Sequence, residues 1–493
     1  MNSTSFAKAL PALLLAFACS EKVPVNQNVL RLHPQNSHYF MFNGKPTVLI
    51  SSAEHYGAVM NADFDFVRYL ETLEQAGFNY TRIFIGPYSE MGSNNFGISN
   101  NTMDPKPDKW LTPWMKDSST QKYDLTSWNQ AFFNRLKAFV SLASEKGIVV
   151  EVTLFTSFYV NNQWQNSPFY FRNNSNALDS IPFVRANTLY NSTLMDYQER
   201  YVRKIIQELN SFNNIFFEIQ NEPWSDNPNL AGYKNETDNK TYPNDWQKKA
   251  EIANNVSLEW QDKIASIIHD EEMQLSNKHL VAQNICNFGI AIQSPNPTVS
   301  IFNFHYAHPE AASENLDKQA AMALDETGFM PHNDFLYRSQ AWKFILAGGA
   351  LYNNLDYSFV VGKEDGTHPI DDRTPGWGGS DYRNQVKVLK DFIESFEFTN
   401  MRPDNSLLKE KEDKDGIEIL AENGKQYAIY IHGGNKAVLS LEIPDGNYRA
   451  EWVNPLSGAI VNAETVVSKN TTLVLPVPPF KEDIAVRLIK NAN

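Results

Sequence analysis

Eight short apolar runs, separated by amphipathic stretches, occupy the chain between Leu30 and Phe398. Short apolar runs are typical of strands in a buried parallel sheet. Eight parallel strands with an outer ring of helices form a (β/α)8 TIM barrel, and this region is long enough for such a barrel with loop insertions. The expected strands are Thr47–Ser51, Tyr80–Ile85, Ile148–Leu154, Asn214–Ile219, Leu280–Gln283, Ser300–Phe304, Met322–Asp325 and Leu351–Leu355.

The stretches between these runs have apolar residues at spacings of three and four, which predicts amphipathic helices. The helices that follow the fifth and sixth strands are short or unclear in the sequence. The expected helices are Phe64–Gln75, Ser127–Lys146, Met195–Leu209, Trp246–Glu272, Phe335–Leu346 and Tyr382–Phe396.

Turn signals mark further structure on both sides of the barrel. Asn43-Gly44 follows an apolar run and predicts a hairpin that plugs the bottom of the barrel. Beyond Phe398, short alternating runs are separated by turns at Asn423-Gly424, Asp445-Gly446 and Ser457-Gly458, which predicts a small antiparallel β-sandwich. We therefore expect a barrel with its N-terminal hairpin over residues 28–400 and a sandwich over 405–493, with strands at Ile417–Leu420, Tyr427–His432, Val438–Ile443, Tyr448–Val453 and Ala485–Ile489.

Residues 1–19 have the character of an export signal, with Lys8 followed by an apolar stretch that is too short to cross a bilayer. The run from Leu14 to Cys19 resembles a bacterial lipoprotein cleavage site, which predicts a lipid anchor on Cys19. Secretion without an anchor is the alternative. No later segment has 18 consecutive apolar residues, so an anchor at Cys19 is the one membrane attachment that we expect.

The charge and cysteine content exclude several classes of protein. The net charge is −14, from 43 basic and 57 acidic residues, which argues against a nucleic acid or an anionic membrane as the main partner. Two cysteines, Cys19 and Cys286, cannot form a disulfide framework. The ten histidines show no metal-binding spacing and no phosphate-binding glycine motif is present, so we expect neither a metal nor a cofactor.

Two acidic residues follow predicted barrel strands, where TIM barrels carry their reactive groups. Glu222 follows the fourth strand in Asn221-Glu222-Pro223-Trp224, and Glu326 follows the seventh. Retaining glycoside hydrolysis needs one carboxyl group to protonate the leaving oxygen and another to attack the anomeric carbon. Strands on opposite sides of a barrel can hold such a pair across a central pocket.

The Asn-Glu-Pro motif resembles that of the clan A retaining glycoside hydrolases, most closely cellulase-like enzymes related to glycoside hydrolase family 5. The resemblance covers the barrel region. It implies that Glu222 is the general acid/base, that Glu326 is the nucleophile and that Asn221 hydrogen-bonds the sugar hydroxyl next to the anomeric carbon. Trp224, directly after the motif, is a further candidate for substrate contact. The mechanism requires carboxyl groups about 5–5.5 Å apart and a raised pKa on the acid/base in the resting enzyme.

Three other residues resemble supporting residues of the same clan. Arg82, after the second strand, corresponds to an arginine that keeps the nucleophile ionised and oriented. His305 and Tyr306, after the sixth strand, correspond to residues that contact the nucleophile and the substrate. We expect all three around the bound sugar.

The sequence departs from the clan at the eighth strand, where a tryptophan usually lies under the sugar. Tyr357 and Trp377 are the candidates to replace it. After the first strand, Glu54 and His55 either recognise sugar hydroxyls or pair with each other or with the backbone.

Long loops follow the second and third strands and are expected to shape a pocket for short oligosaccharides or chain ends. Their aromatic residues either stack on sugar rings or pack within the loops. These residues are Trp110, Trp114, Trp164, Phe169, Tyr170 and Phe171.

The sequence therefore predicts an exported retaining glycoside hydrolase that acts on a polysaccharide or its oligosaccharides. A non-catalytic carbohydrate-binding protein of the cell surface is one alternative, and the presence of both Glu222 and Glu326 disfavours it. A transglycosylase that uses the same residues is another. The sandwich resembles accessory domains found behind such barrels, and we expect it to buttress the barrel.

Overall fold

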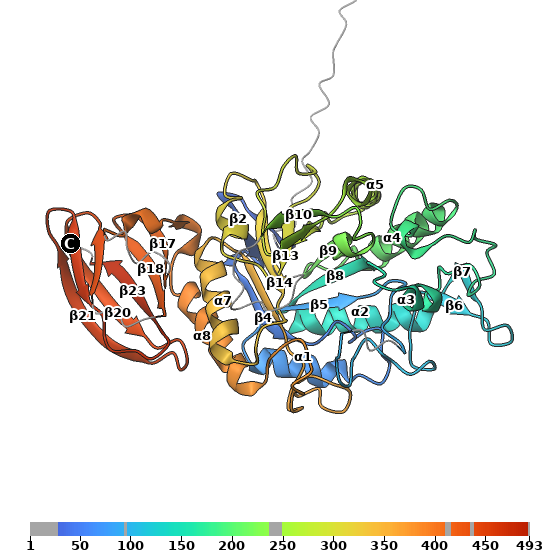
Figure 1. Ribbon diagram of the computed structural model, residues 1–493, viewed down its shortest axis with the longest axis horizontal. Coiled ribbons are helices and arrows are strands. Elements are labelled where there is room, and N and C mark those ends of the chain that lie inside the picture. Colours follow the sequence, from blue (N-terminus) through green and yellow to red (C-terminus); the bar gives the residue numbers. More distant parts are fainter. Residues whose placement is uncertain (1–27, 93–95, 236–248, 410–415, 434–437, 492–493) are drawn as a thin grey trace, which may run out of the picture.

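The computed structural model describes residues 28–92, 96–235, 249–409, 416–433 and 438–491, and its central feature is a parallel eight-stranded barrel (Figure 1). The strands follow one another around the barrel in the order β4-β15-β14-β13-β12-β9-β8-β5. β4 and β5 meet through a hydrogen bond from Phe84 N to Tyr56 O of 3.1 Å. The strands are β4 (Leu49–Ala53), β5 (Tyr80–Phe84), β8 (Val149–Thr156), β9 (Ile215–Asn221), β12 (Val281–Asn287), β13 (Ile301–His305), β14 (Ala321–Glu326) and β15 (Leu351–Leu355).

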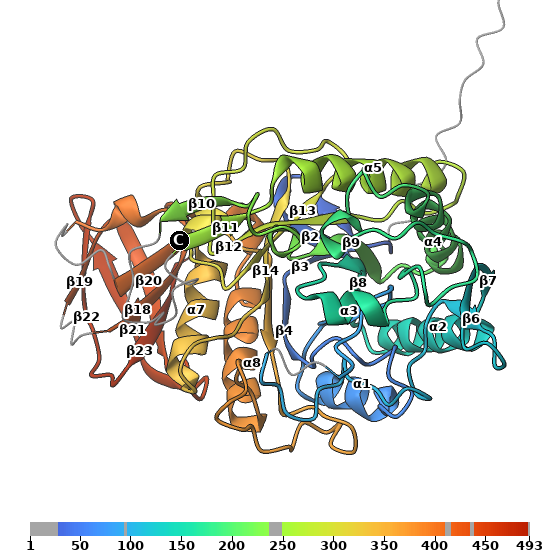
Figure 2. The ribbon, with the colours of Figure 1, turned by 45° about the vertical axis from the view of Figure 1, so that its right-hand side comes forward.

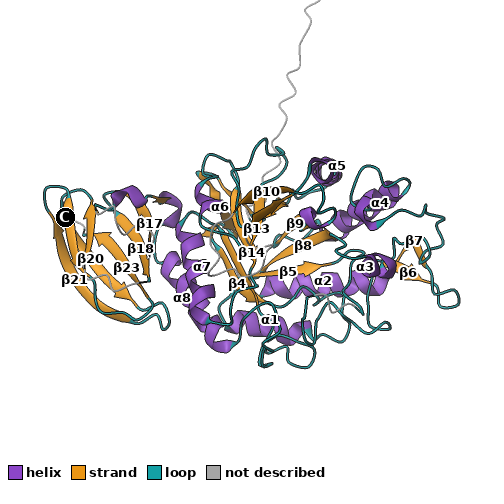
Figure 3. Ribbon diagram, viewed as in Figure 1, coloured by secondary structure: helices purple, strands orange, loops and turns teal. Residues whose placement is uncertain are grey.

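These strands confirm the (β/α)8 barrel expected from the sequence. Every residue in all eight is buried, because helices cover the outer face and side chains fill the inner face. Helices surround the sheet in Figure 3, and they are α1 (Phe66–Gln75), α2 (Gln130–Glu145), α4 (Leu194–Leu209), α5 (Asn255–Glu272), α7 (Asp334–Leu346) and α8 (Ser380–Glu394), with the short α3 (Asn161–Asn166) and α6 (Glu310–Ser313).

The prediction of one helix over Trp246–Glu272 is wrong in its first part. Lys249–Ile252 is strand β11, which pairs with β10 (Gly232–Asn235) and reaches the barrel strand β12 through Ile252 opposite Cys286. The helix begins only after Asn254, whose side chain accepts a hydrogen bond from Ser257 N and caps it. Pairing with β10, and at Ile252 with β12, thus overrides the helix-like local sequence.

A three-stranded antiparallel sheet lies at the N-terminal end of the barrel strands. It contains β1 (Arg31–His33), β2 (Asn36–Phe42) and β3 (Lys45–Thr47). Leu30 N donates to Asn213 O just before β9, and the His38 ring contacts Ala320 O just before β14. The predicted Asn43-Gly44 turn connects β2 and β3, with φ values of 48° and 73° that match a type I′ hairpin.

The chain after the barrel forms the expected antiparallel sandwich. One sheet has the order β16-β17-β18-β23-β20-β21 and the other pairs β19 with β22. The sequence analysis missed β21, an edge strand whose residues are mostly exposed, and β22, whose alternating Leu473 and Leu475 were an available signal. The strands are β16 (Arg402–Pro403), β17 (Ile417–Glu422), β18 (Gln426–His432), β19 (Val438–Glu442), β20 (Gly446–Val453), β21 (Ile460–Ser468), β22 (Thr472–Pro476) and β23 (Asp483–Lys490).

Helix α7 lies between the barrel and the sandwich (Figure 1) and is apolar on both sides. Trp342 on α7 stacks on Tyr430 of β18 at 5.1 Å between ring centroids. Arg338 of α7 is buried and bonds the Asp483 carboxylate of β23 through Nε at 2.8 Å. One face of the larger sandwich sheet therefore joins the apolar core of the barrel through Leu420, Ala428, Tyr430 and Ala485, while the interior of the sandwich forms a second apolar cluster.

The expected export signal, with Cys19, lies outside the described residues. None of the helices in the described ranges has the length and apolar character needed to cross a bilayer.

Candidate active site

Glu222 comes directly after β9, where the chain makes a sharp turn. Its backbone is left-handed, with φ 47° and ψ 56°, and Pro223 then begins the 3-10 helix η2 (Pro223–Ser225). A left-handed residue other than glycine costs about 1–2 kcal/mol. A hydrogen bond from Glu222 N to Asn284 Oδ1 at 2.8 Å helps to hold this turn, which directs the Glu222 carboxyl group over the barrel.

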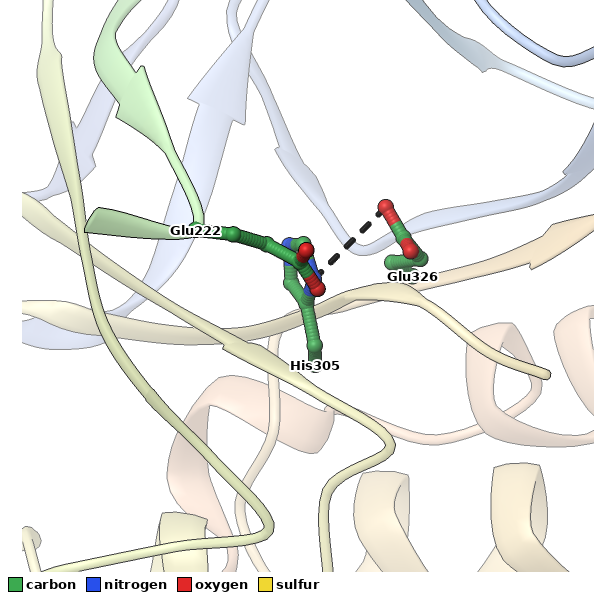
Figure 4. A group of neighbouring side chains, drawn as sticks. All are labelled: Glu222, His305 and Glu326. Atoms are coloured by element: carbon green, nitrogen blue, oxygen red, sulfur yellow. Dashed lines mark hydrogen bonds and ion pairs between the residues drawn. The ribbon is translucent and has the colours of Figure 1, made fainter. Parts of the chain in front are cut away.

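The carboxyl groups of Glu222 and Glu326 point into a shared space beside the His305 ring (Figure 4). One carboxylate oxygen of each glutamate and one ring nitrogen of His305 all lie within 4.8 Å of one another. The Tyr306 hydroxyl reaches Glu326 Oε1 at 2.8 Å and Glu222 Oε1 at 3.3 Å. This closeness agrees with the separation of about 5–5.5 Å in retaining glycosidases and not with the 6.5–9.5 Å of inverting ones.

Glu326 ends β14 and is held by hydrogen-bond donors on several sides. Tyr56 Oη donates to Glu326 Oε2 at 2.8 Å, and Arg82 Nη1 lies 3.4 Å from the same oxygen. The Tyr56 ring stacks on Phe84 with centroids 4.4 Å apart. These donors fix the position of the Glu326 carboxyl group at the end of the strand. The sequence analysis missed Tyr56, although its place after the first strand was an available signal.

Arg82 lies inside the barrel, under the two glutamates, and is completely buried. Its Nε donates to Glu218 Oε2 at 3.1 Å, its Nη2 donates to Asn221 Oδ1 at 2.8 Å, and its Nη1 lies 3.3 Å from Asp325 Oδ2. The guanidinium thus links the candidate nucleophile to Asn221 and to a layer of buried carboxyl groups below the pocket.

The acidic members of this layer are Glu151, Glu218 and Asp325, and the sequence analysis did not select them. Burial and then the charge of Glu218 raise the pKa of Glu151 well above its ordinary value. Burial also raises the pKa of Asp325, to about 7. Each acid stands inside or beside an apolar run, and that unusual placement was an available signal.

Glu222 and His305 share a hydrogen bond, with Nδ1 and Oε1 2.8 Å apart. Burial raises the pKa of Glu222, but hydrogen bonds from His305, Tyr159 and Tyr306 outweigh burial and lower the pKa below its ordinary value. Burial opposes the charge on His305, but the carboxylates of Glu326 and Asp325 outweigh it and raise the pKa of His305 to about 9. In the free protein the shared proton therefore lies on His305. The sequence analysis expected a raised pKa for Glu222, and the structure instead gives a lowered one.

A cavity of 330 Å³ opens above these groups at the carboxyl ends of the strands. Aromatic rings form most of its wall, and a few polar side chains are placed among them, as in many small-molecule sites. The lining residues include His55, Tyr56, Phe84, Tyr88, Glu90, Phe96, Ile98, Tyr159, Asn221, Glu222, Trp224, Glu251, Asn287, Tyr306, Glu326, Phe329 and Tyr357.

Most of the residues selected from the sequence lie in or directly under this cavity, but Glu54 and Trp377 are not among its lining residues. The Glu54 carboxylate is fully buried and accepts hydrogen bonds from Gly57 N and Ala58 N, so the backbone-pairing alternative holds for Glu54. The Trp377 indole donates to Asp334, which makes Tyr357 the remaining candidate for stacking at the eighth strand.

The aromatic residues expected in the loops are not among the lining residues either. Trp114, Trp164 and Phe169 are buried, and Trp110, Tyr170 and Phe171 are partly buried and pack against the core. Tyr159, which the sequence analysis missed, does reach the site: its hydroxyl donates to Glu222 Oε2 at 2.6 Å and accepts from Asn221 Nδ2 at 2.9 Å. Trp110, Trp114 and Trp164 therefore pack in or against the hydrophobic core and do not line the cavity.

Within the described ranges, two sets of side chains bring three potential metal-ligand atoms within 4.8 Å of one another. One set is Glu222, His305 and Glu326, and the other is Glu151, Glu218 and Asp325. Tyrosine hydroxyls already bind the carboxylates of the first set, and the Arg82 guanidinium occupies the second. The donors around both sets fit hydrogen-bonded carboxyl groups better than a bound cation.

No protein-family model and none of the curated proteins compared matches this sequence. The fold, however, is shared with solved structures. A family 5 glycoside hydrolase from Bacteroides vulgatus has a TM-score of 0.61 and 12% identity, over 95% of this chain and 95% of that chain. A second protein of the same organism, provisionally assigned as a glycoside hydrolase, has a TM-score of 0.64 and 12% identity, over 95% and 84% of the two chains. At 12% sequence identity, the similarity to these two structures shows only that the fold is shared.

Proposed function

We propose that this protein is a retaining glycoside hydrolase that cleaves β-glycosidic bonds in oligosaccharides or polysaccharides by double displacement. One observation carries the proposal: two carboxyl groups, from Glu222 and Glu326, face a common cavity at retaining distance and share the Tyr306 hydroxyl. The shared fold agrees with this chemistry.

In the first step, the Glu326 carboxylate attacks the anomeric carbon and forms a glycosyl ester. The bond to the leaving oxygen breaks, and that oxygen receives a proton from Glu222. In the second step, Glu222 takes a proton from water, and the resulting oxygen displaces Glu326 from the sugar. Asn221, fixed between Arg82 and Tyr159, presents its amide toward the hydroxyl next to the anomeric carbon.

The proton for the leaving oxygen comes from the Glu222–His305 pair, which holds a single proton between two buried groups. His305 stores this proton in the free enzyme, and Glu222 delivers it when the glycosidic oxygen enters the site. As pH rises, hydrolysis should therefore continue until the Glu222–His305 pair loses its proton.

Replacement of His305 by glutamine tests this proton source. The raised pKa of His305, about 9, predicts that kcat/KM of the wild type falls as pH rises through about 9. In His305→Gln the proton resides on Glu222 alone, so the alkaline limb should move to lower pH by about one unit or more. The measurement is kcat/KM against pH. His269→Gln, on the exposed face of α5, is the control. An alkaline limb that stays in place in His305→Gln would show that the pair does not supply the proton.

The reaction itself is tested with a panel of aryl β-glycosides and plant oligosaccharides, with the anomer of the first product followed by NMR. We expect a product of retained configuration. Inversion would exclude the double displacement, and transfer of the glycosyl unit to a second sugar in place of water would identify a transglycosylase. A protein that binds members of the panel and cleaves none would be a carbohydrate-binding protein.

A further inference from the structure

The Glu222 side of the cavity contains two polar groups whose hydrogen-bonding capacity is unused among the described residues. Asn287 is 1% exposed and lines the cavity, and its Nδ2 has no hydrogen-bond partner there. The half-buried Glu251 also lines the cavity, and no described side chain or backbone N–H donates to its carboxylate. A buried donor without a partner is costly, so such groups commonly bind a ligand or water.

The β10–β11 hairpin positions this pair. Glu251 lies on β11, and its backbone N–H donates to Asn287 Oδ1 at the end of the barrel strand β12 (Figure 2). This bond fixes the Asn287 amide through Oδ1 and, within the described ranges, leaves Nδ2 as its unpaired buried group. Strand β11 packs against η2, the turn that begins directly after Glu222, so Glu251 and Glu222 lie on the same side of the cavity. Burial and then the charge of Glu222 raise the pKa of Glu251. Lys249, on the same strand, partly offsets these effects.

The opposite side of the cavity belongs to Glu326. His55 packs against Tyr56, which donates to Glu326, and against Tyr357, and it pairs with Glu90 at 3.2 Å. The attacked sugar ring must lie over Glu326, and the departing oxygen must lie at Glu222. The sugar that leaves therefore extends past Glu222 toward Glu251 and Asn287.

We infer that Glu251 and Asn287 form a subsite for the leaving sugar, and that this sugar is neutral and carries at least two free hydroxyls. This inference rests on the proposed function. One hydroxyl donates to the Glu251 carboxylate and a neighbouring hydroxyl accepts from Asn287 Nδ2. A uronic acid is disfavoured at this position because its carboxylate would face both Glu251 and Glu222. An aryl group without hydroxyls leaves both residues unpaired.

The test compares leaving groups on the same glycosyl unit. The substrate pairs are 4-nitrophenyl β-glucoside with cellobiose, the β-mannoside with β-1,4-mannobiose, and the β-xyloside with xylobiose. The variants are Glu251→Gln and Glu251→Ala. Glu259→Gln, on the exposed face of α5, removes the same charge outside the cavity and is the matched control.

We expect kcat/KM for the disaccharide to fall about 10-fold in Glu251→Gln and about 100-fold in Glu251→Ala, mainly through KM. Hydrolysis of the nitrophenyl glycoside should change by less than about 3-fold, because its leaving group makes neither hydrogen bond. Unfolding temperatures of all variants separate a loss of contact from a loss of folding, and Glu251→Gln keeps the test available if the alanine variant fails to fold.

Two results would overturn this inference alone. In the first, kcat/KM for the disaccharide is unchanged in both Glu251→Gln and Glu251→Ala. In the second, kcat/KM falls equally for the disaccharide and the nitrophenyl glycoside of a pair. Equal loss would mean that Glu251 acts on the chemistry through Glu222. If the protein cleaves no member of any pair and no substrate of the wider panel, the proposed function is wrong and this inference fails with it.

Discussion

Replacement of Glu326 by alanine is expected to lower kcat about 10⁴-fold or more on every substrate, because the proposed attacking group is lost. The surrounding donors, Tyr56, Tyr306 and Arg82, would remain in place around an empty space. Sodium azide can enter that space and attack the anomeric carbon directly. We therefore expect azide to restore turnover of an activated β-glycoside and to give the α-glycosyl azide.

Glu222→Ala should behave differently, because it removes the proposed proton donor and keeps the proposed nucleophile. Substrates with a poor leaving group should lose about 10²–10⁴-fold in kcat/KM, whereas a 2,4-dinitrophenyl glycoside should lose much less in the first step. Azide should then yield the β-glycosyl azide from the accumulated glycosyl ester. Glu259→Ala is the control. Full activity in either variant, or the same azide anomer from both, would contradict the assigned roles.

Replacement of Arg82 by methionine is expected to destabilise the protein by about 3–5 kcal/mol, because it leaves Glu218, Asp325 and Glu326 without their buried cation. The same change should abolish activity, since Asn221 and Glu326 both lose a hydrogen-bond donor. Urea unfolding measures the first effect. Arg68→Met, which breaks a largely exposed ion pair with Asp365, should cost less than about 1 kcal/mol.

A double variant can distinguish the electrostatic cost of Arg82→Met from the cost of lost side-chain packing. The double variant Arg82→Met/Glu218→Gln removes one of the unpaired charges, so it should recover part of the lost stability. The cost of Arg82→Met should also shrink at low pH, where the raised pKa values of Glu151 and Asp325 let these groups bind protons readily. Unchanged stability in Arg82→Met, or a double variant less stable than the single one, would show that the guanidinium does not compensate the buried carboxylates.

The barrel was predictable from the sequence because its strands are buried on both faces, which leaves largely apolar runs such as Val149–Thr156, interrupted by Glu151. The region near Lys249–Ile252 was not, because β11 owes its conformation to pairing with β10 along its length and with Cys286 of β12 at Ile252. Edge strand β21 was missed because most of its residues are exposed, so its sequence shows no regular alternation of buried apolar residues.

The candidate site was predictable where a residue follows a barrel strand directly, as Asn221, Glu222 and Glu326 do. It was not predictable where the loop backbone decides the direction of a side chain. Glu54 turns back to bind the amides of its own loop. Tyr159 reaches Glu222 from beyond β8, and only the folded loop brings the two together. Their contacts depend on tertiary structure rather than on spacing along the chain.

The buried contact of helix α7 with the sandwich means that the barrel and the sandwich should melt as one cooperative unit. Trp342 and Arg338 have their partners, Tyr430 and Asp483, in the sandwich. A chain cut after the barrel would expose that aromatic face to water and leave a buried cation without its counterion. One face of the sandwich is thus a permanent covering of the barrel's hydrophobic surface, and the sandwich is not a detachable module.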